Sequence, residues 1–298
     1  MIHFDQMSTE TRNKNTMNLD QMTSLEIVTV MNQEDAQVPQ AIQPVLPQIA
    51  QAVDWVVQSF QANGRLFYLG AGTSGRLGVL DASECPPTFG VSADMVIGLM
   101  AGGDAAFRKA VEGAEDSPAL GKQDLIDHRL QAQDVVIGVA ASGRTPYAMG
   151  ALEYARDMGC HTIAIVCNQH SAMAAMAELA IEIVPGPEIL TGSTRLKAGT
   201  AQKLVLNMIS TASMVGMGKC YQNLMVDVVQ SNEKLNARAE HIVTEATGVS
   251  AATARQKIDE AGGSVKVAIT MILADCNREQ AELRLAKHQG RIRQAIQA

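Results

Sequence analysis

Two short loops rich in glycine and hydroxyl side chains could bind an anion. The first is Gly70-Ala-Gly-Thr-Ser-Gly-Arg76 and the second is Ala141-Ser-Gly-Arg-Thr-Pro146, and each follows a short apolar run. A loop that leaves a parallel strand and enters a helix directs backbone N–H groups at an anion, at the positive end of the helix dipole. The serine and threonine hydroxyls add further donors. The two loops therefore predict a phosphate pocket, with a phosphorylated small molecule as the ligand.

Each loop also has an explanation that needs no phosphate. Ser142 or Thr145 could cap a helix whose first turn contains Pro146. The first loop also matches the Gly-x-Gly-x-x-Gly pattern of dinucleotide-binding folds, which place an acidic residue at the end of the next strand. Here the run 95–100 is followed by Ala-Gly-Gly, and Asp104 comes later. The same chemistry after two different strands favours the phosphate pocket.

Five apolar runs of strand length must position these loops. They alternate with helical segments and lie at residues 65–69, 95–100, 134–140, 162–166 and 181–184. This alternation predicts an α/β three-layer sandwich, in which a parallel five-stranded sheet has helices on both faces. Because both loops follow strands, we expect them at the carboxyl edge of the sheet, where such folds bind their ligands.

Helical segments are expected both before and after this core in the sequence. Apolar residues recur near helical spacing between residues 19 and 31, so the N-terminal part is expected to form a mainly helical arm. A long methionine-rich helical region is expected from Lys197 to about Asn236, with apolar side chains in the core or at a subunit contact. Turns at 247–250 and 261–264 divide the last segment into a small bundle of short helices.

The composition excludes several functional classes. Of the 298 residues, 47% are hydrophobic and 18% are charged, which excludes a disordered chain. No apolar run approaches the roughly 20 residues that a membrane span needs. The net charge of −7 and the few aromatic residues (one Trp, four Tyr and five Phe) argue against a nucleic-acid partner. We therefore expect a globular protein whose partner is a small molecule, with no membrane and no nucleic acid.

Cysteine and histidine show no metal-binding pattern. The five cysteines are an odd number without a Cys-x-x-Cys pair, and the six histidines show no His-Glu-x-x-His spacing. We therefore expect no disulfide and no metal site, as in a reducing compartment. The N-terminus lacks a basic stretch followed by an apolar one, which favours a cytoplasmic location.

Together, the two loops resemble the sugar isomerase (SIS) phosphosugar-binding domain. The segment Gly186-Pro-Glu-Ile-Leu-Thr-Gly-Ser-Thr-Arg-Leu-Lys-Ala-Gly-Thr-Ala201 is similar to a signature shared by glucokinase regulatory protein and the bacterial N-acetylmuramic acid 6-phosphate etherases. Three further segments resemble the etherases in particular: Asp81-Ala-Ser-Glu-Cys-Pro-Pro87, Ala110-Val-Glu-Gly-Ala-Glu-Asp-Ser117 and Asn223-Leu-Met-Val-Asp-Val-Val229. The likeness covers nearly the whole chain.

The resemblance implies a domain organisation and an activity. The implied parts are a helical arm over 1–54, an SIS domain over 55–220, and a helical region over 221–298 ending in a small UBA-like bundle. The etherases cleave the D-lactyl ether of N-acetylmuramic acid 6-phosphate to N-acetylglucosamine 6-phosphate and D-lactate. They eliminate lactate and add water, in the recycling of cell-wall amino sugars. The resemblance implies no cofactor, and it implies a homodimer, because SIS pockets commonly use residues of a second subunit.

Two glutamates carry the implied chemistry. By resemblance, Glu84 is the proton donor to the departing lactate, and Glu115 is the second acid or base, to which we assign deprotonation of C2. Glu112 and Asp116 are neighbours with the same chemistry, so the residues by themselves leave this choice open. Only the resemblance selects Glu115.

Residues of the two loops are the implied phosphate ligands. The expected set is Gly72, Thr73, Ser74, Ser142, Gly143 and Thr145. Ser193 and Lys197 of the signature segment are candidates for sugar contacts, although a capping serine and a surface lysine explain them equally well. Arg76 and Arg144 are candidates for structural roles.

Two other functions would use similar loops. A phosphosugar sensor without catalysis would resemble glucokinase regulatory protein, and an aldose-ketose phosphosugar isomerase would need only a single base. The regulator carries two SIS domains, whereas this chain has one, with both candidate glutamates in place. Release of lactate separates the etherase from the isomerase.

Overall fold

A computed structural model describes residues 7–109, 111–229 and 232–297. The chain gathers into two units. The first contains the residues up to Ser83 together with Asp94–Ser210, and the second contains Glu84–Ala93 together with the residues from Thr211 onward. The division of the chain at residues 54 and 220 stays a prediction from the sequence.

The first unit is built on a parallel five-stranded sheet, as predicted. Its strands follow the order β2-β1-β3-β4-β5. Their bounds are β1 (Leu66–Gly70), β2 (Val96–Met100), β3 (Val135–Ala140), β4 (His161–Val166) and β5 (Leu179–Glu182). Every residue of β1 and β3 is buried, which explains why these strands are continuous apolar runs rather than alternating ones.

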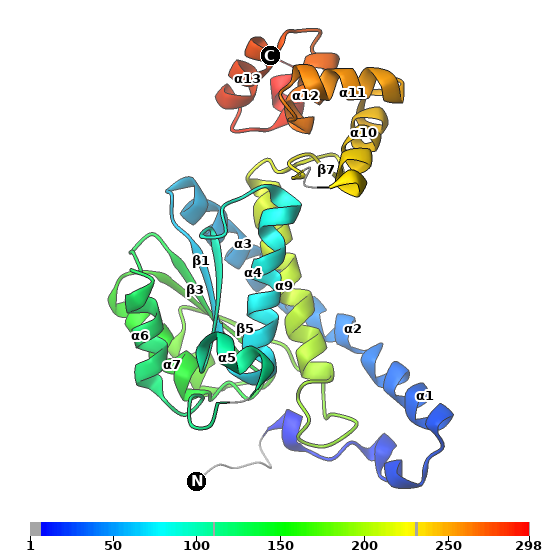
Figure 1. The fold of residues 1–298 in the computed structure, drawn as a ribbon. Helices are drawn as coiled ribbons and strands as arrows, with labels where there is room; N and C mark the ends of the chain where they lie inside the picture. The colour runs from blue at the N-terminus through cyan, green and yellow to red at the C-terminus, as the bar shows by residue number, and fades with distance from the viewer. Residues whose placement is uncertain (1–6, 110, 230–231, 298) are drawn as a thin grey trace. The chain divides into compact units, whose positions relative to one another are not determined.

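Helices cover both faces of this sheet (Figure 1). On one side lie α3 (Leu46–Gln61), α4 (Gly72–Phe89) and α9 (Lys197–Gly216), and on the other lie α6 (Pro118–Asp127) and α7 (Pro146–Asp157). A core of buried side chains that includes Phe67, Val136 and Leu152 joins the sheet to α7. Burial of each such side chain contributes roughly 1.5–3 kcal/mol to folding. The three-layer α/β prediction is therefore confirmed.

The strand order brings the two predicted loops together. From β1 the chain crosses to β2 on one side and later returns to β3 on the other, so β1 and β3 are neighbours, with Leu66 opposite Val135. The helix after β1 lies on one face of the sheet and the helix after β3 lies on the opposite face. Such a reversal opens a crevice at the carboxyl ends of the two strands. Both loops therefore lie at one sheet edge, as expected.

The N-terminal segment combines short 3-10 turns with helices. In chain order these are η2 (Ser8–Glu10), η3 (Lys14–Thr16), η4 (Leu19–Gln21), α1 (Ser24–Asp35), α2 (Val38–Ile42) and η5 (Gln43–Val45). The Ser8 hydroxyl donates to Asn168 Oδ1 at 3.0 Å, and the Thr16 hydroxyl donates to the carbonyl of Ile189 at 2.8 Å. The segment is thereby bonded to residues that follow β4 and β5.

The second unit contains a short hairpin and a helical bundle. Its elements are β6 (Cys220–Tyr221), β7 (Leu224–Met225), α10 (Glu233–Thr247), α11 (Ala251–Glu260), α12 (Val265–Leu273), α13 (Arg278–Lys287) and α14 (Ile292–Ala295). The predicted turns at 247–250 and 261–264 are present: Gly248, Gly262 and Gly263 have positive φ angles of 76°, 65° and 87°. A Cβ atom disfavours this backbone conformation, so glycine is the natural residue there.

The expectation of a long helical region from Lys197 to about Asn236 was wrong beyond Gly216. Helix α9 ends at Gly216, and Gly218 then takes a positive φ of 73°. The chain forms the β6–β7 hairpin, in which Gln222 also has a positive φ of 54°. Apolar spacing suits a short hairpin as well as a helix, so periodicity could not separate the two.

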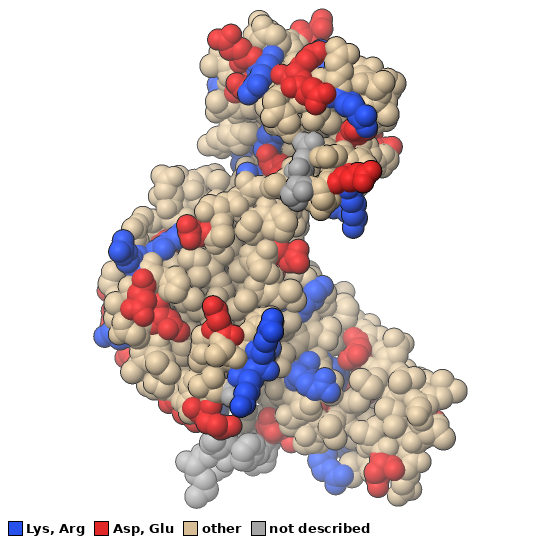
Figure 2. Space-filling model, viewed as in Figure 1, with Lys and Arg blue, Asp and Glu red and all other residues tan. Residues whose placement is uncertain are grey.

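The surface carries both signs of charge. On the face drawn in Figure 2, basic and acidic side chains are interspersed among uncharged ones. In the described ranges, no helix has both the length and the hydropathy to cross a membrane.

The remaining two helices are short segments of the first unit. They are α5 (Gly103–Arg108), which follows β2, and α8 (Ala172–Met176), which lies between β4 and β5.

Candidate active site

The first loop is shorter than the sequence indicated, because helix α4 already begins at Gly72. Gly70 ends β1, and Thr73 and Ser74 lie in the first helical turn, where backbone N–H groups have no partner within the helix. A Cβ on Gly70 or Gly75 would overlap backbone atoms, so only glycine lets the helix start this close to the strand. The turn therefore offers amides at a helix N-terminus, as an anion site requires.

Ser74 has a partner that the sequence analysis missed. The Ser74 hydroxyl donates to Oε1 of Gln202 on α9 at 2.9 Å, and both side chains are buried. Close by, Gly199 of α9 lies against the Thr73 methyl group. Gln202 comes directly after the signature segment, which was the only available signal for it.

The second loop is a tight turn between β3 and α7. The Arg144 N–H donates to Ser142 Oγ at 3.2 Å, and the Gly143 N–H donates to the Ala140 carbonyl at 3.2 Å. Gly143 has a φ of 67°, and a Cβ there would overlap the Ser171 side chain. Glycine is thus required both by the backbone and by the space.

Thr145 does not use its hydroxyl to cap α7. It occupies the N-cap position, but its side chain makes no capping bond and instead donates to Glu115 Oε1 at 3.2 Å. The Glu115 carbonyl also accepts the Tyr147 N–H at 3.0 Å. Backbone and side chain therefore both hold Glu115 against the start of α7.

Glu115 also borders the first loop. A small hollow of about 100 Å³ is lined by Ala71, Gly72, Arg76, Met100, Ala101, Ala106, Val111 and Glu115. The Arg76 guanidinium donates to the carbonyls of Ala106 and Phe107, at 2.7 and 2.8 Å. Glu115 is exposed, as are the rival carboxylates Glu112 and Asp116, but of the three only Glu115 lines this hollow.

The other predicted glutamate, Glu84, lies further along α4. It is exposed and belongs to the second unit. Ten residues of one helix separate it from Ser74, which corresponds to about 15 Å along the axis. The first turn of α4 and Glu84 are thus at different levels of the same helix.

Lys197 and Ser193 lie at the start of α9. Lys197 is 1% exposed, and its Nζ pairs with Glu34 Oε2 at 2.7 Å. The Glu188 carboxylate accepts the N–H groups of Lys197 and Ala198 at 2.9 and 3.0 Å, so it caps the helix. Ser193 donates its N–H to Leu190 in the preceding turn at 3.0 Å. The alternative explanation of Lys197 as a surface lysine was wrong, because its side chain is buried against Glu34. The sugar contacts expected of Lys197 and Ser193 stay predictions.

A second hollow adjoins the second loop. It measures about 200 Å³ and is lined by Met7, Ser142, Arg144, Asn168, Gln169, His170 and Ser171. Asn168 Nδ2 donates to the Ala141 carbonyl and to Thr9 Oγ1, each at 3.0 Å. Sequence reasoning missed Asn168, although its position two residues after the end of β4, at the same sheet edge, was an available signal.

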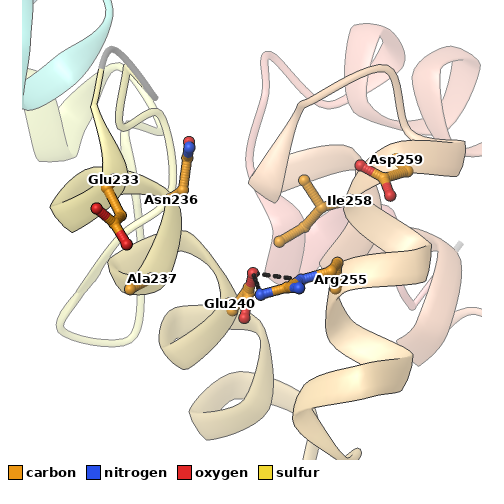
Figure 3. A pocket seen from close by; sticks show the side chains of 7 residues that line it. All are labelled: Glu233, Asn236, Ala237, Glu240, Arg255, Ile258 and Asp259. Atoms are coloured by element: carbon orange, nitrogen blue, oxygen red, sulfur yellow. Dashed lines mark hydrogen bonds and ion pairs between the residues drawn. The ribbon is translucent and has the colours of Figure 1, made fainter.

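A larger hollow in the second unit contains none of the predicted residues. Its volume is about 430 Å³. Figure 3 shows its lining side chains on α10 and α11. Its Arg255 faces Glu240, with a closest approach of 2.7 Å, so this charge is balanced within the protein. Among the described residues no group of three or more His, Cys, Asp or Glu side chains could hold a metal ion.

Comparison with curated proteins identifies the family. The chain is 61% identical over 295 residues to the N-acetylmuramic acid 6-phosphate etherase of Pectobacterium atrosepticum, which covers 99% of this chain and 97% of the relative. It is 56% identical over 292 residues to the protein of the same name from Halalkalibacterium halodurans, covering 98% of each. The chain belongs to the N-acetylmuramic acid 6-phosphate etherase family.

Domain models match overlapping parts of this etherase-family chain, and a solved structure shares its fold. Residues 48–156 match the glucokinase regulatory protein N-terminal SIS domain, and residues 118–212 match the SIS domain. The fold is similar to that of a phosphoheptose isomerase from Francisella tularensis, with a TM-score of 0.51 at 17% identity, covering 65% of this chain and 100% of that one. The resemblance found in the sequence is thereby confirmed.

Proposed function

We propose that this chain cleaves the D-lactyl ether of N-acetylmuramic acid 6-phosphate, giving N-acetylglucosamine 6-phosphate and D-lactate, as a carbon–oxygen lyase of amino-sugar recycling. The observation that carries the proposal is the position of Glu115. Its carboxylate accepts the Thr145 hydroxyl of the second loop and lines the same hollow as Gly72 of the first loop, in a chain of the etherase family.

The two loops would bind the 6-phosphate. Amides of the first turn of α4 and of the second loop are the donors, and hydroxyls of the loop residues add to them. The proposed ligands are Gly72, Thr73, Ser74 and Ser142, together with the backbone at Gly143 and Thr145, because the Thr145 hydroxyl donates to Glu115. Ser193 and Lys197 are proposed to lie nearer the sugar. A hydrogen bond to a charged group contributes about 1.5–3 kcal/mol, so several of them suffice to hold a phosphate.

The chemistry proceeds through the open-chain aldehyde. A proton on C2 lies next to the carbonyl and can be removed by Glu115, a C2–C3 double bond forms, and the C3–O bond breaks as Glu84 protonates the departing lactate. Water then adds: Glu84 takes a proton from water, the hydroxyl joins C3, and Glu115 returns a proton to C2. Both carboxyls regain their starting states, so no other reactant is consumed.

A homodimer would supply the second carboxyl. C3 of the sugar is five covalent bonds from the phosphorus, which is far shorter than the spacing of about 15 Å between Ser74 and Glu84 along α4. We therefore assign Glu84 to the site of the neighbouring subunit. Exposed apolar side chains are available for an interface, among them Leu25 and Val28 on α1 and Leu80 on α4.

A cytoplasmic location fits the proposal. The five cysteines are free thiols, and burial raises the pKa of Cys160 to about 12. Free thiols are typical of a reducing compartment.

The decisive experiment follows lactate and the hydrogen on C2. The purified protein is incubated with N-acetylmuramic acid 6-phosphate in deuterated water, without added metal or nucleotide. D-lactate together with deuterium at C2 of the product supports elimination followed by hydration. Folded protein that binds the substrate and releases no lactate would instead be a phosphosugar sensor, and exchange or isomerisation without lactate would indicate an isomerase.

A further inference from the structure

The inference concerns Gln202, a buried residue with an incomplete set of partners. Gln202 is 1% exposed and Ser74 is 8% exposed, and the Ser74 hydroxyl donates to Gln202 Oε1 at 2.9 Å. Within the part of the chain that the structure describes, Gln202 Nε2 is buried and makes no hydrogen bond. Buried amide groups are nearly always bonded, so an unpartnered one at a binding loop calls for an explanation.

The direction of this hydrogen bond matters, because a serine hydroxyl has one proton. While Ser74 donates to Gln202, it has no proton to offer a phosphate oxygen. If the amide of Gln202 turns over, Nε2 faces Ser74 Oγ and donates to it. The hydroxyl then accepts from Gln202 and its proton is free for the ligand. Glutamine is suited to this exchange because it carries a donor and an acceptor on one planar group.

We propose that Gln202 is a positioning residue for phosphate recognition, whose amide turns over so that the Ser74 proton is directed at the ligand. The inference rests on the proposed function, in which Ser74 is a phosphate ligand. Gln202 acts only through Ser74 and touches no reacting atom. Because anionic phosphate binds only the arrangement in which Ser74 donates outward, the ligand selects that arrangement.

The test is a double-mutant cycle in which calorimetry measures the affinity of each variant for N-acetylglucosamine 6-phosphate. Ser74→Ala and Gln202→Met are each expected to weaken binding about tenfold. Since the two side chains act as one unit, the double variant is also expected to lose about tenfold, and not about a hundredfold. If Gln202 acted through packing alone, the losses of binding from the two single variants would add up in the double variant. Such an additive loss would overturn the proposal.

Gln202→Glu sharpens the test. A carboxylate only accepts, so it would hold the Ser74 proton and add a negative charge near the phosphate. We expect weaker binding than for Gln202→Met, and no loss for the unphosphorylated sugar. Gln48→Met is the matched control, because Gln48 on α3 also has a buried amide atom without a hydrogen-bond partner among the described residues. Binding by Gln202→Met equal to that of Gln48→Met would overturn the proposal.

The outcomes separate this inference from the proposed function. If the wild-type protein releases lactate, and Ser74→Ala weakens binding of N-acetylglucosamine 6-phosphate but Gln202→Met does not, only the role of Gln202 is overturned. If the wild-type protein binds no phosphosugar, the proposed function and this inference are both overturned. Thermal unfolding of each variant verifies that Gln202→Met and Gln202→Glu are folded before binding is compared.

Discussion

At the scale of single residues, the contact between Thr145 and Glu115 decides how the second loop is understood. The sequence grouped Thr145 with the phosphate ligands, whereas its hydroxyl donates to Glu115 at 3.2 Å. A residue that only binds phosphate affects substrate affinity, but a residue that orients a base affects the chemical step. Loss of phosphate binding would therefore mainly raise KM, whereas loss of the base's orientation would mainly lower kcat.

Thr145→Val is expected to lower kcat about tenfold, with a smaller change in KM. Valine has the same shape without the hydroxyl, so the Glu115 carboxylate loses the bond that orients it. The measurement is steady-state release of D-lactate. Thr200→Val is the control, because the exposed Thr200 hydroxyl donates to the carbonyl of Leu196, which directly precedes α9. A raised KM at unchanged kcat would contradict this and would indicate that Thr145 only binds the phosphate.

Glu115→Gln is expected to lower kcat by about 10²- to 10⁴-fold, the usual contribution of a positioned base. Glu112→Gln is the matched control, because it removes the same charge three residues away, and it should stay close to wild type. Deuterium incorporation at C2 should be lost with Glu115→Gln, since this step precedes lactate release. If Glu112→Gln abolishes exchange instead, the two assignments are reversed.

At the scale of elements, the start of α9 is held by buried charges. Glu188 accepts two N–H groups of its first turn, and Lys197 pairs with Glu34 of α1 at 2.7 Å. Asn15 donates to the other oxygen of Glu34 at 2.8 Å. These bonds tie the N-terminal segment to the helix that carries Gln202.

Lys197→Met should destabilise the protein by about 3–5 kcal/mol, because it leaves the Glu34 carboxylate buried and unpaired. The double variant Glu34→Gln with Lys197→Met should recover much of this loss, since it leaves no isolated charge. Urea unfolding at neutral pH measures both. A loss in the double variant as large as in the single one would mean that packing, and not the charge, is responsible.

The same ion pair predicts a pH dependence. Burial acts to raise the pKa of Glu34, but the bonds from Lys197 and Asn15 outweigh it and lower the pKa below the ordinary value of 4.5. A carboxyl whose pKa is lower in the folded state contributes stability above its unfolded pKa and loses it as the pH falls through the folded pKa. Below pH 4.5, the free energy of unfolding of Glu34→Gln should therefore fall less steeply with decreasing pH than that of wild type. Parallel acid-unfolding curves would contradict this.

At the scale of the whole molecule, the question is which chain supplies Glu84. The proposed homodimer gives each site Glu115 from one subunit and Glu84 from its neighbour. A mixed dimer of Glu84→Gln and Glu115→Gln chains would then contain one site with both glutamates and one with neither. A site completed within one chain would never be restored by mixing.

Coexpression of the two variants should therefore restore activity. With random pairing, about one quarter of the sites are intact, so lactate release should reach about a quarter of the wild-type rate per chain. Differently tagged chains allow heterodimers to be purified and verified. Verified heterodimers without activity would show that both glutamates act within one chain.

The sequence alone determined the α/β layers, the five parallel strands and the two loops at one sheet edge. It could do so because these features depend on local apolar runs, on glycines and on the alternation of strands with helices along the chain. Only the tertiary structure decided the partners of the site residues. Ser74 meets Gln202 across 128 positions and Lys197 meets Glu34 across 163, and no local pattern encodes which distant side chain fills a buried contact. A buried polar group needs a hydrogen-bond partner, and the packing of the complete fold determines which distant residue lies close enough to be that partner.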